Sequence, residues 1–585
     1  MNQNLRKLYD FIKPAANEFL IKPMLGDSIS LGIINYYKLN QEILQLPDID
    51  FAELVISAFD HSILDNEKFL ETSFRVFIND AEIDQIAIHN NIDNALTAIQ
   101  KREKLISLGK GKMKKEIIRI LNLEKEYFNP IFQNEYLTRE TITPFNPVPV
   151  NELNYKDLIG KEYLALHEYQ KRIKDRIIQK LIFEPKGKLL VHMPTGSGKT
   201  KTAVEAIIDF IRVSLKSDQT GTVIWFAHSK ELCEQAYNTF KAMWKFKGDY
   251  PINAYKYFGD SDLDDTLKIV DDKMSIIFMG FQKFNPVLNS RIGDKPRPLR
   301  QFFHLNTRLV IVDEAHKSLA NTYSKAIEFV TEMPNCRLLG LTATPGRSNY
   351  IEGDNQNTEL SQFFGTDIIS ITDQNGTKLE NPLYYLQNSK PQVLAKINFD
   401  FLNFEINLTQ EYSAKDIERF SIQEDLDENA LNKFAVNPLR NRLIINAITD
   451  ALAKNESILV FACTTDHCII LQRLLKLYKI HSEVILGTTE KTARSHYIEE
   501  FKSNKLKVLI NYGVLSTGFD APNLNTLIIA RPTKSIVLYS QIVGRALRGP
   551  ANGGNELNTI VTIKDNLIGF PNADFMFSYW DAFWN

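Results

Sequence analysis

The chain has 585 residues, of which 44% are hydrophobic and 24% are charged, and its formal net charge is −2 at pH 7. This length exceeds what one hydrophobic core supports, so we expect about three folded units. The composition excludes a disordered chain, because globular proteins have similar hydrophobic and charged fractions. The near-neutral total argues neither for nor against a nucleic-acid partner, because a large protein can carry a local basic groove within a neutral total.

The first 150 residues are predicted to form a mainly helical domain of unknown role. Apolar residues recur at helical spacing around Leu105 and Ile117, and several prolines between 130 and 149 indicate a linker or extended arm. The basic segment 110–119 favours a solvated helix face, with a grip on duplex DNA as the alternative. This domain is also where we expect a protein partner to dock.

From about residue 155, short apolar runs alternate with amphipathic helical stretches, which is typical of a parallel α/β sheet. The alternation pauses in a polar region and then resumes, so the fold class predicted is α/β with two similar tandem lobes. We expect a first lobe at 155–370, a connector or insertion at 371–435 and a second lobe at 436–575. The runs predicted to be buried strands are 188–193, 222–227, 275–280, 308–313, 337–342, 457–462, 482–487, 507–512, 525–530 and 558–563.

A phosphate-binding loop is the sharpest local feature. The segment MPTGSGKT (193–200) follows a predicted strand and opens a predicted helix, which is the context of a P-loop. Glycines let the backbone amides wrap around phosphate oxygens, and the helix N-terminus favours negative charge. We expect Lys199 to bridge the β- and γ-phosphates of ATP and Thr200 to bind Mg²⁺. The loop residues predicted to bind ATP are Thr195, Gly196, Ser197, Gly198, Lys199 and Thr200.

An acidic pair follows a later strand, as hydrolysis requires. Asp313 and Glu314, in the tetrapeptide DEAH, end the strand RLVIVD. Asp313 is predicted to hold Mg²⁺, and Glu314 to polarise the attacking water as general base. The hydroxyl residues Thr342 and Thr344 follow the next strand and could link this acidic pair to the other lobe.

The P-loop is followed by DEAH and then by TAT (342–344), and this order of motifs resembles the first lobe of superfamily 2 helicases. In the second lobe, QIVGRALR (541–548) resembles the family pattern QxxGRxxR. The resemblance implies two RecA-like lobes, with Arg548 as arginine finger, Arg545 as phosphate or water-site partner and Gln541 facing the nucleotide. The two arginine roles could be exchanged, and we expect both arginines on one face of one helix.

The resemblance also implies further contacts with ATP and nucleic acid. Gln170 stands where the family reads adenine, and Asp520 is placed near the ribose or the arginine helix. Ser229, after the second strand, is interpreted as a phosphate contact, a helix cap, or both. The residues predicted to contact nucleic acid are Ser229, Gln282, Thr464, Thr488, Thr517 and Gly518.

The motif style resembles restriction-enzyme motor subunits and XPB-like DNA repair helicases more than DEAD-box RNA helicases, so DNA is favoured over RNA. Three functions remain open: a repair helicase or translocase, a motor subunit of a bacterial defence assembly, and an ATP-gated clamp on nucleic acid. RNA remodelling is the alternative substrate class. ATP and Mg²⁺ are the expected cofactors.

Cysteine usage and the apolar stretches predict the compartment. No two cysteines form a CxxC pair, which argues against a standard zinc site and favours a reducing, cytoplasmic setting. No sustained apolar run resembles a signal peptide or a membrane span, so no membrane partner is expected. The four cysteines are Cys233, Cys336, Cys463 and Cys468.

Overall fold

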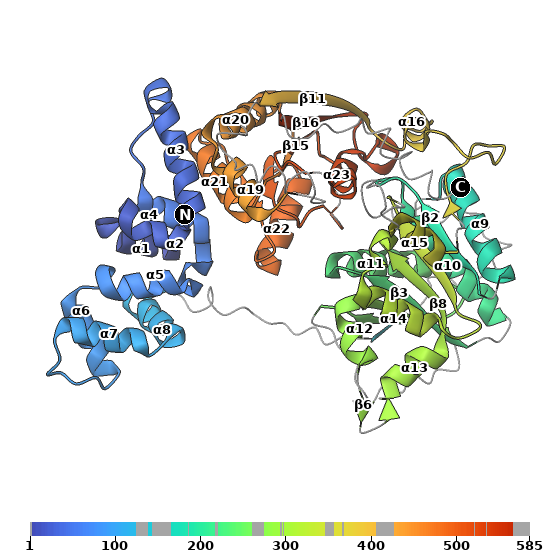
Figure 1. The fold of residues 1–585 in the computed structure, drawn as a ribbon, viewed down its shortest axis with the longest axis horizontal. Helices are drawn as coiled ribbons and strands as arrows, with labels where there is room; N and C mark the ends of the chain where they lie inside the picture. The colour runs from blue at the N-terminus through green and yellow to red at the C-terminus, as the bar shows by residue number, and fades with distance from the viewer. Residues whose placement is uncertain are drawn as a thin grey trace.

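The computed structural model shows two α/β lobes and a helical N-terminal region (Figure 1). The two lobes confirm the predicted fold class of tandem RecA-like parallel sheets after a mainly helical segment. The structure describes residues 3–123, 139–142, 165–184, 186–216, 220–259, 274–289, 291–292, 295–296, 298–344, 356–365, 368–404, 426–516, 518–519, 521–533 and 535–565.

Described residues up to 123 form helices, because their apolar positions recur at helical spacing and polar side chains cap the helix starts. Asn79 and Thr97 each form a capping box with the residue three positions on. Gly109, at φ +86°, separates the last two helices. The α-helices are α1 (Gln3–Ile12), α2 (Glu18–Leu25), α3 (Asp27–Leu44), α4 (Phe51–Phe59), α5 (Glu67–Thr72), α6 (Asp80–His89), α7 (Ala98–Ser107) and α8 (Lys110–Ile120).

The first lobe is built on an 8-stranded sheet in the order β1-β4-β5-β3-β8-β9-β2-β10. Every pairing is parallel except that of β1 with β4. The five apolar runs predicted for this lobe are strands β2, β3, β5, β8 and β9. The bounds are β1 (Arg139–Ile142), β2 (Lys188–His192), β3 (Gly221–Ala227), β4 (Ile252–Tyr257), β5 (Met274–Gly280), β8 (Thr307–Asp313), β9 (Arg337–Thr342) and β10 (Ile368–Ile369); β6 (Arg291–Ile292) and β7 (Lys295–Pro296) form a separate ribbon.

Helices cover both faces of this sheet because its strands are apolar on both sides. Val223 and Trp225 of β3 pack in one core with α9, α10 and α11, whereas Ile224 and Phe226 pack in another with α12, α13 and α14. This alternation follows the two-residue period of a strand. The helices are α9 (Glu168–Phe183), α10 (Lys199–Lys216), α11 (Lys230–Lys247), α12 (Phe281–Leu288), α13 (Pro298–Asn306), α14 (Asn321–Thr331) and α15 (Gln356–Phe363).

The second lobe is a parallel sheet in the order β11-β16-β15-β12-β14-β13. The five runs predicted here are β12 to β16. Its strands are β11 (Lys396–Phe404), β12 (Ile458–Phe461), β13 (Glu483–Ile485), β14 (Val508–Asn511), β15 (Thr526–Ile529) and β16 (Leu557–Asp565). Its helices, with the preceding α16, are α16 (Pro382–Gln387), α19 (Glu428–Val436), α20 (Pro438–Ala453), α21 (Thr465–Leu477), α22 (Lys491–Lys502) and α23 (Ile536–Val543).

Strand β11 lies inside the segment 371–435, which the sequence predicted to be a connector or insertion. It pairs with β16 along its whole length and forms one edge of the second sheet. Most of its side chains are partly or fully exposed. The strand therefore lacks the continuous apolar run by which the buried strands were recognised.

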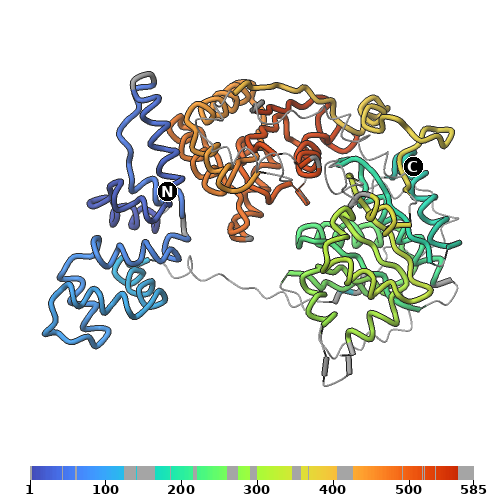
Figure 2. Tube along the Cα trace, in the orientation of Figure 1, coloured from blue at the N-terminus to red at the C-terminus, as the bar shows by residue number. Residues whose placement is uncertain are grey.

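The N-terminal helices pack on the second lobe. Helix α3 contacts α19, α20 and α21, and the blue N-terminal tube runs beside the orange second lobe in Figure 2. One hydrophobic core contains apolar residues of both regions, including Tyr36 of α3 and Ile470 of α21. The Tyr36 and Tyr478 hydroxyls are hydrogen-bonded at 2.6 Å. This region and the second lobe therefore share a core.

No helix among the described residues is both long enough and apolar enough to cross a lipid bilayer.

Candidate active site between the two lobes

The glycine-rich segment between β2 and α10 folds into a tight loop. Gly196 and Gly198 adopt φ values of +82° and +81°, which side chains other than glycine rarely tolerate. The Ser197 hydroxyl donates to the Pro194 carbonyl at 2.6 Å and closes the turn. Helix α10 begins at Lys199. The first backbone amides of the helix and the Lys199 ammonium group therefore lie beside the loop.

Residues at the start of α9 form hydrogen bonds to the backbone of this loop. The Gln170 carboxamide accepts from the His167 N–H at 2.8 Å and donates to the Ser197 carbonyl at 3.0 Å. The Tyr169 hydroxyl donates to the same carbonyl at 2.6 Å. A Cβ on Gly198 would lie 2.3 Å from the Gln170 nitrogen, so only glycine fits there. Gln170 is thus brought to the loop, and its contact with adenine stays a prediction.

The acidic pair at the end of β8 meets the loop lysine. The Lys199 ammonium lies 3.7 Å from Asp313 Oδ1 and 3.6 Å from Glu314 Oε1. Glu314 has φ +53°, an uncommon left-handed conformation, and its N–H donates to Asp313 Oδ1 at 3.0 Å. The structure therefore brings together the three residues predicted to handle phosphate, metal and water.

The two carboxylates have opposite electrostatic environments. Burial raises the pKa of Asp313 above its usual value, and the neighbouring Lys199 only partly offsets this effect. Burial is also the largest effect on the pKa of Glu314 and would raise it, but the Lys199 ammonium together with His316, His228 and Lys317 outweighs burial and lowers this pKa. Glu314 is consequently ionised and can accept a hydrogen bond from water.

His316, the last residue of DEAH, joins the acidic pair to both neighbouring motifs. Its Nδ1 lies 3.4 Å from Glu314 Oε2 and 3.3 Å from the Thr342 hydroxyl, and its Nε2 lies 3.4 Å from the Gln541 amide nitrogen of the second lobe. Burial lowers the pKa of His316 to about 3, so the ring is neutral. Nδ1 therefore faces Glu314 and Thr342 of the first lobe, whereas Nε2 faces the second lobe. Sequence reasoning gave His316 no role, although its place within DEAH was the available signal.

A second contact links Lys317, three positions after Glu314, to the end of β3. The Lys317 ammonium donates to His228 Nε2 at 2.9 Å, and His228 directly precedes Ser229. Burial lowers the pKa of His228 to about 4, with Lys317 acting in the same direction. Neither residue was predicted from the sequence, because a lysine and a histidine 89 positions apart carry no local signal.

The second lobe touches the phosphate loop directly. A Cβ on Gly544 would lie 2.5 Å from Thr195 Cβ, and a Cβ on Gly196 would lie 3.3 Å from Leu394 Cδ2. The Asn552 side chain donates to the Gly196 carbonyl at 3.4 Å. Leu394 and Asn552 were missed by sequence reasoning, since neither belongs to a motif.

The two arginines do not share a helix, contrary to the expectation from their spacing. Helix α23 carries Gln541 and ends at Val543, and Arg545 lies in a following 3-10 turn where it donates to the Phe519 carbonyl at 2.5 Å. Arg548 lies in extended backbone that bridges Leu394. The bridge to Leu394 requires extended backbone, so the helix cannot continue through Arg548. Arg548 donates to the carbonyl of Asn552, whose side chain reaches the phosphate loop.

The predicted nucleic-acid contacts lie at the carboxyl ends of strands. Ser229 and Thr464 cap α11 and α21, each accepting a backbone N–H, and Thr464 is buried. Gln282 and Thr488 are exposed. Gly518 has φ +69° and packs against the first turn of α11, which brings it close to Ser229. Thr517 and Asp520 lie outside the described residues.

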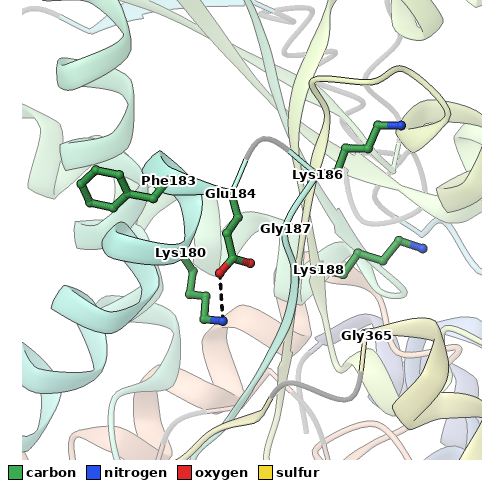
Figure 3. Close-up of a pocket in the computed structure, with 7 residues that line it drawn as sticks. All are labelled: Lys180, Phe183, Glu184, Lys186, Gly187, Lys188 and Gly365. Carbon is green, nitrogen blue, oxygen red and sulfur yellow. Dashed lines mark ion pairs between the residues drawn. The ribbon is translucent and has the colours of Figure 1, made fainter.

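A surface pocket lies at the opposite end of β2 from the phosphate loop (Figure 3). The Lys180 ammonium pairs with Glu184 at 3.1 Å, and the Lys186 and Lys188 side chains extend away from that pair. The pocket is therefore separate from the residues predicted to bind ATP. Its lining residues are Lys180, Phe183, Glu184, Lys186, Gly187, Lys188 and Gly365.

Two protein families match the chain. Residues 163–347 match the family described as type III restriction enzyme, res subunit, and residues 440–550 match the helicase conserved C-terminal domain. Each match falls on one lobe and includes that lobe's motif residues, from Lys199 to Glu314 in the first and from Gln541 to Arg548 in the second. The chain belongs to the superfamily 2 helicases. It therefore carries both domains of an ATP-dependent helicase.

Curated relatives agree with this family. The putative ATP-dependent helicase IRC3 of Saccharomyces cerevisiae is 24% identical over 66% of this chain and 49% of its own length. The type I restriction enzyme EcoKI endonuclease subunit of Escherichia coli is 23% identical over 67% of this chain and 34% of its own. The ATP-dependent DNA helicase MPH1 of Debaryomyces hansenii is 26% identical over 47% of this chain and 22% of its own length. The matched part thus spans half or less of each of these relatives.

Proposed function

We propose that this superfamily 2 helicase hydrolyses ATP between its two lobes and uses the cycle to move along or remodel DNA. The observation that carries the proposal is the position of Lys199, which lies within 4 Å of both Asp313 and Glu314 while the second lobe touches the same loop through Gly544. A nucleotide bound at that loop contacts both lobes, so the phosphate state can open and close the cleft.

In the proposed site, the phosphate loop and Lys199 hold the ATP phosphates. Mg²⁺ prefers oxygen ligands and takes few from the protein when phosphate oxygens supply the rest. The Thr200 hydroxyl, next to Lys199 in the first turn of α10, and the buried Asp313 carboxylate fit that requirement. Bound Mg²⁺ supplies charge neutralisation at the phosphates, and Gln170 and the ribose-side Asp520 remain the proposed nucleoside contacts.

Glu314 is the proposed general base. The Glu314 carboxylate contacts the His316 ring and pairs with the Lys199 ammonium, and these two contacts hold it at the end of β8. When the Lys199 ammonium engages phosphate, it stabilises the Glu314 carboxylate less. The pKa of Glu314 then rises, which makes the carboxylate a better acceptor for a proton of the attacking water.

The second lobe is proposed to complete the site through Gln541, Arg545 and Arg548. Gln541 reaches His316, and Arg548 reaches Asn552 beside the phosphate loop. A guanidinium that moves onto the γ-phosphate would stabilise the charge that develops during cleavage. Arg548 is the proposed finger, with Arg545 as the exchangeable alternative.

DNA is the proposed substrate, in DNA repair or bacterial defence, because MPH1 is named a DNA helicase and the EcoKI subunit a restriction-enzyme endonuclease subunit. The restriction-enzyme relative also supports assembly with other subunits. The four cysteines are buried free thiols, which supports action in a reducing compartment such as the cytoplasm.

ATP hydrolysis by the purified chain, measured alone and with single-stranded DNA, duplex DNA, forked DNA or RNA, tests the proposal. We expect DNA to stimulate turnover strongly and Lys199→Ala to abolish it. Stimulation by RNA alone would replace DNA with RNA as substrate. Turnover that no polymer changes would contradict the proposed motor.

A strand-displacement assay separates a motor from an ATP-gated clamp. A helicase releases a labelled strand from forked DNA in an ATP-dependent manner, whereas a clamp binds DNA tightly with ATP and releases no strand. Displacement of a bound protein roadblock without strand release would indicate translocation.

A further inference from the structure

An ion pair crosses between the lobes outside the nucleotide site. Arg494 of α22 donates from Nη1 to Glu231 Oε1 of α11 at 2.9 Å. Its Nη2 donates to the carbonyls of Leu486 and Gly487 at 2.9 and 3.3 Å. These two carbonyls follow β13 and aim the guanidinium at the first lobe. The arginine is therefore held by its own lobe before it meets its partner.

Glu231 stands between residues predicted to contact nucleic acid. It lies in the first turn of α11, two positions after Ser229. A Cβ on Gly518 of the second lobe would lie 3.1 Å from Glu231 Cβ. A nucleic-acid backbone that reached both Ser229 and Gly518 would pass this carboxylate. Glu231 would repel it, because phosphate and carboxylate are both anions.

The ion pair leaves the guanidinium incompletely satisfied. Arg494 Nε is buried and has no hydrogen-bond partner among the described residues, while Glu231 is bonded through Nη1 alone. The Glu231 side chain is 45% exposed, so solvent screens the pair. A phosphate group carries more negative charge than a carboxylate and can replace Glu231 as the acceptor at Nη1.

We propose that Arg494 binds a backbone phosphate of nucleic acid and that Glu231 occupies it in the free protein as an internal competitor. The inference rests on the proposed function and names a contact that the sequence motifs did not indicate. Binding then exchanges a carboxylate for a phosphate at one arginine, and Glu231 lowers the affinity of the groove for nucleic acid. Removing the carboxylate should strengthen binding, whereas removing a residue that only supports the fold would weaken it.

The test is fluorescence anisotropy with a labelled 20-nucleotide oligo(dT) and four proteins: wild type, Glu231→Gln, Arg494→Gln and the double variant. We expect Glu231→Gln to bind about three- to tenfold tighter and Arg494→Gln to bind about three- to tenfold more weakly. Arg494→Gln should also reduce the slope of log K against log salt by about 0.7, the value for one lost phosphate contact on a single strand. The double variant should bind like Arg494→Gln, because Glu231 has no arginine left to release.

Glu499→Gln is the matched control, since it removes one negative charge from an exposed position of α22, the helix that carries Arg494. It should leave the affinity unchanged. A gain from Glu231→Gln that persists without Arg494, or that Glu499→Gln reproduces, would show a general charge effect and overturn the inference. Weaker binding by Glu231→Gln would show instead that the pair closes the lobes productively, and would also overturn it.

Two further results separate the inference from the proposed function. If wild type binds the oligonucleotide but Glu231→Gln binds equally well, only the inference fails. If wild type binds no nucleic acid of any kind, the proposed function fails and the inference with it. Thermal melting checks that each variant is folded, and Glu231→Ala replaces Glu231→Gln should the latter melt much lower than wild type.

Discussion

The two lobes share one architecture but divide the work unequally. The first lobe holds the phosphate loop and both carboxylates, and its own helices cover its sheet on both faces. The second lobe reaches the acidic pair's neighbour His316 through Gln541, while its helices α19, α20 and α21 pack against the N-terminal α3. One core of the first lobe continues into apolar residues of the second lobe, whose other core extends into the N-terminal helices from the opposite end of the sequence.

This difference locates the moving boundary of the molecule. Because helix α3 packs directly on α19, α20 and α21, any opening of the cleft should carry the N-terminal helices and the second lobe together relative to the first lobe. The contacts that change are then those between Thr195 and Gly544, His316 and Gln541, and Glu231 and Arg494. Variants in each lobe can therefore distinguish residues that act in ATP hydrolysis from residues that stabilise the fold.

The largest effect should come from the second lobe's arginine. Arg548→Ala should lower nucleic-acid-stimulated ATP turnover by about 10³-fold, in the range of other arginine fingers, while ATP still binds. Steady-state hydrolysis and binding of a fluorescent ATP analogue measure the two quantities. Arg545→Ala is the comparison variant, and a larger loss there would exchange the two proposed roles.

Glu314→Gln should remove the general base of the first lobe and lower turnover by about 10²-fold or more. ATP and nucleic acid should bind at least as well as in wild type, because the glutamine keeps the shape of the side chain. Glu328→Gln, on the exposed face of α14, is the matched control. Normal turnover by Glu314→Gln would show that another group activates water.

Acid should destabilise the second lobe through His467. This buried histidine accepts from the Cys463 N–H and donates to Asn441, and burial holds its pKa well below 6.5. The folded state keeps the ring neutral while the unfolded state binds a proton below pH 6.5, so stability is present above that pH and lost as pH falls. The loss grows as pH falls below 6.5, by at most about 1.4 kcal/mol for each pH unit.

Urea unfolding of wild type and His467→Gln at pH 7 and pH 5 measures this contribution. We expect the variant to be less stable than wild type at pH 7 and the difference in unfolding free energy to be smaller at pH 5. The exposed His481→Gln is the control. A gap that stays constant between the two pH values would mean that His467 is protonated in the folded protein.

The smallest expected effect concerns the hydrophobic core that the N-terminal helices share with the second lobe. Tyr36→Phe removes the hydroxyl bonded to Tyr478 and should cost about 1 kcal/mol of unfolding free energy. Tyr384→Phe, at a side chain 63% exposed, should cost nothing measurable. If Tyr36→Phe lowers only a separate unfolding transition of the N-terminal helices, those helices and the second lobe do not unfold as one unit.

The sequence by itself determined the parts of the molecule that depend on neighbours along the chain. The phosphate loop needs a strand, glycines and a helix start in one short segment, and the buried strands need continuous apolar runs, so both were recognisable from the residues alone. The acidic pair at the end of β8 followed from the same local pattern. Its approach to Lys199 was predicted only through the resemblance of the whole motif order to a family.

Only the tertiary structure decided the contacts made between distant segments. Strand β11 is an edge strand with mostly exposed side chains, so its pairing with β16 left no apolar run to recognise. Arg548 leaves the helix because its backbone bridges Leu394, and α3 reaches the second lobe through apolar residues that any helix bundle could use. Such contacts depend on which surfaces the folded chain brings together, and no spacing within a single segment encodes them.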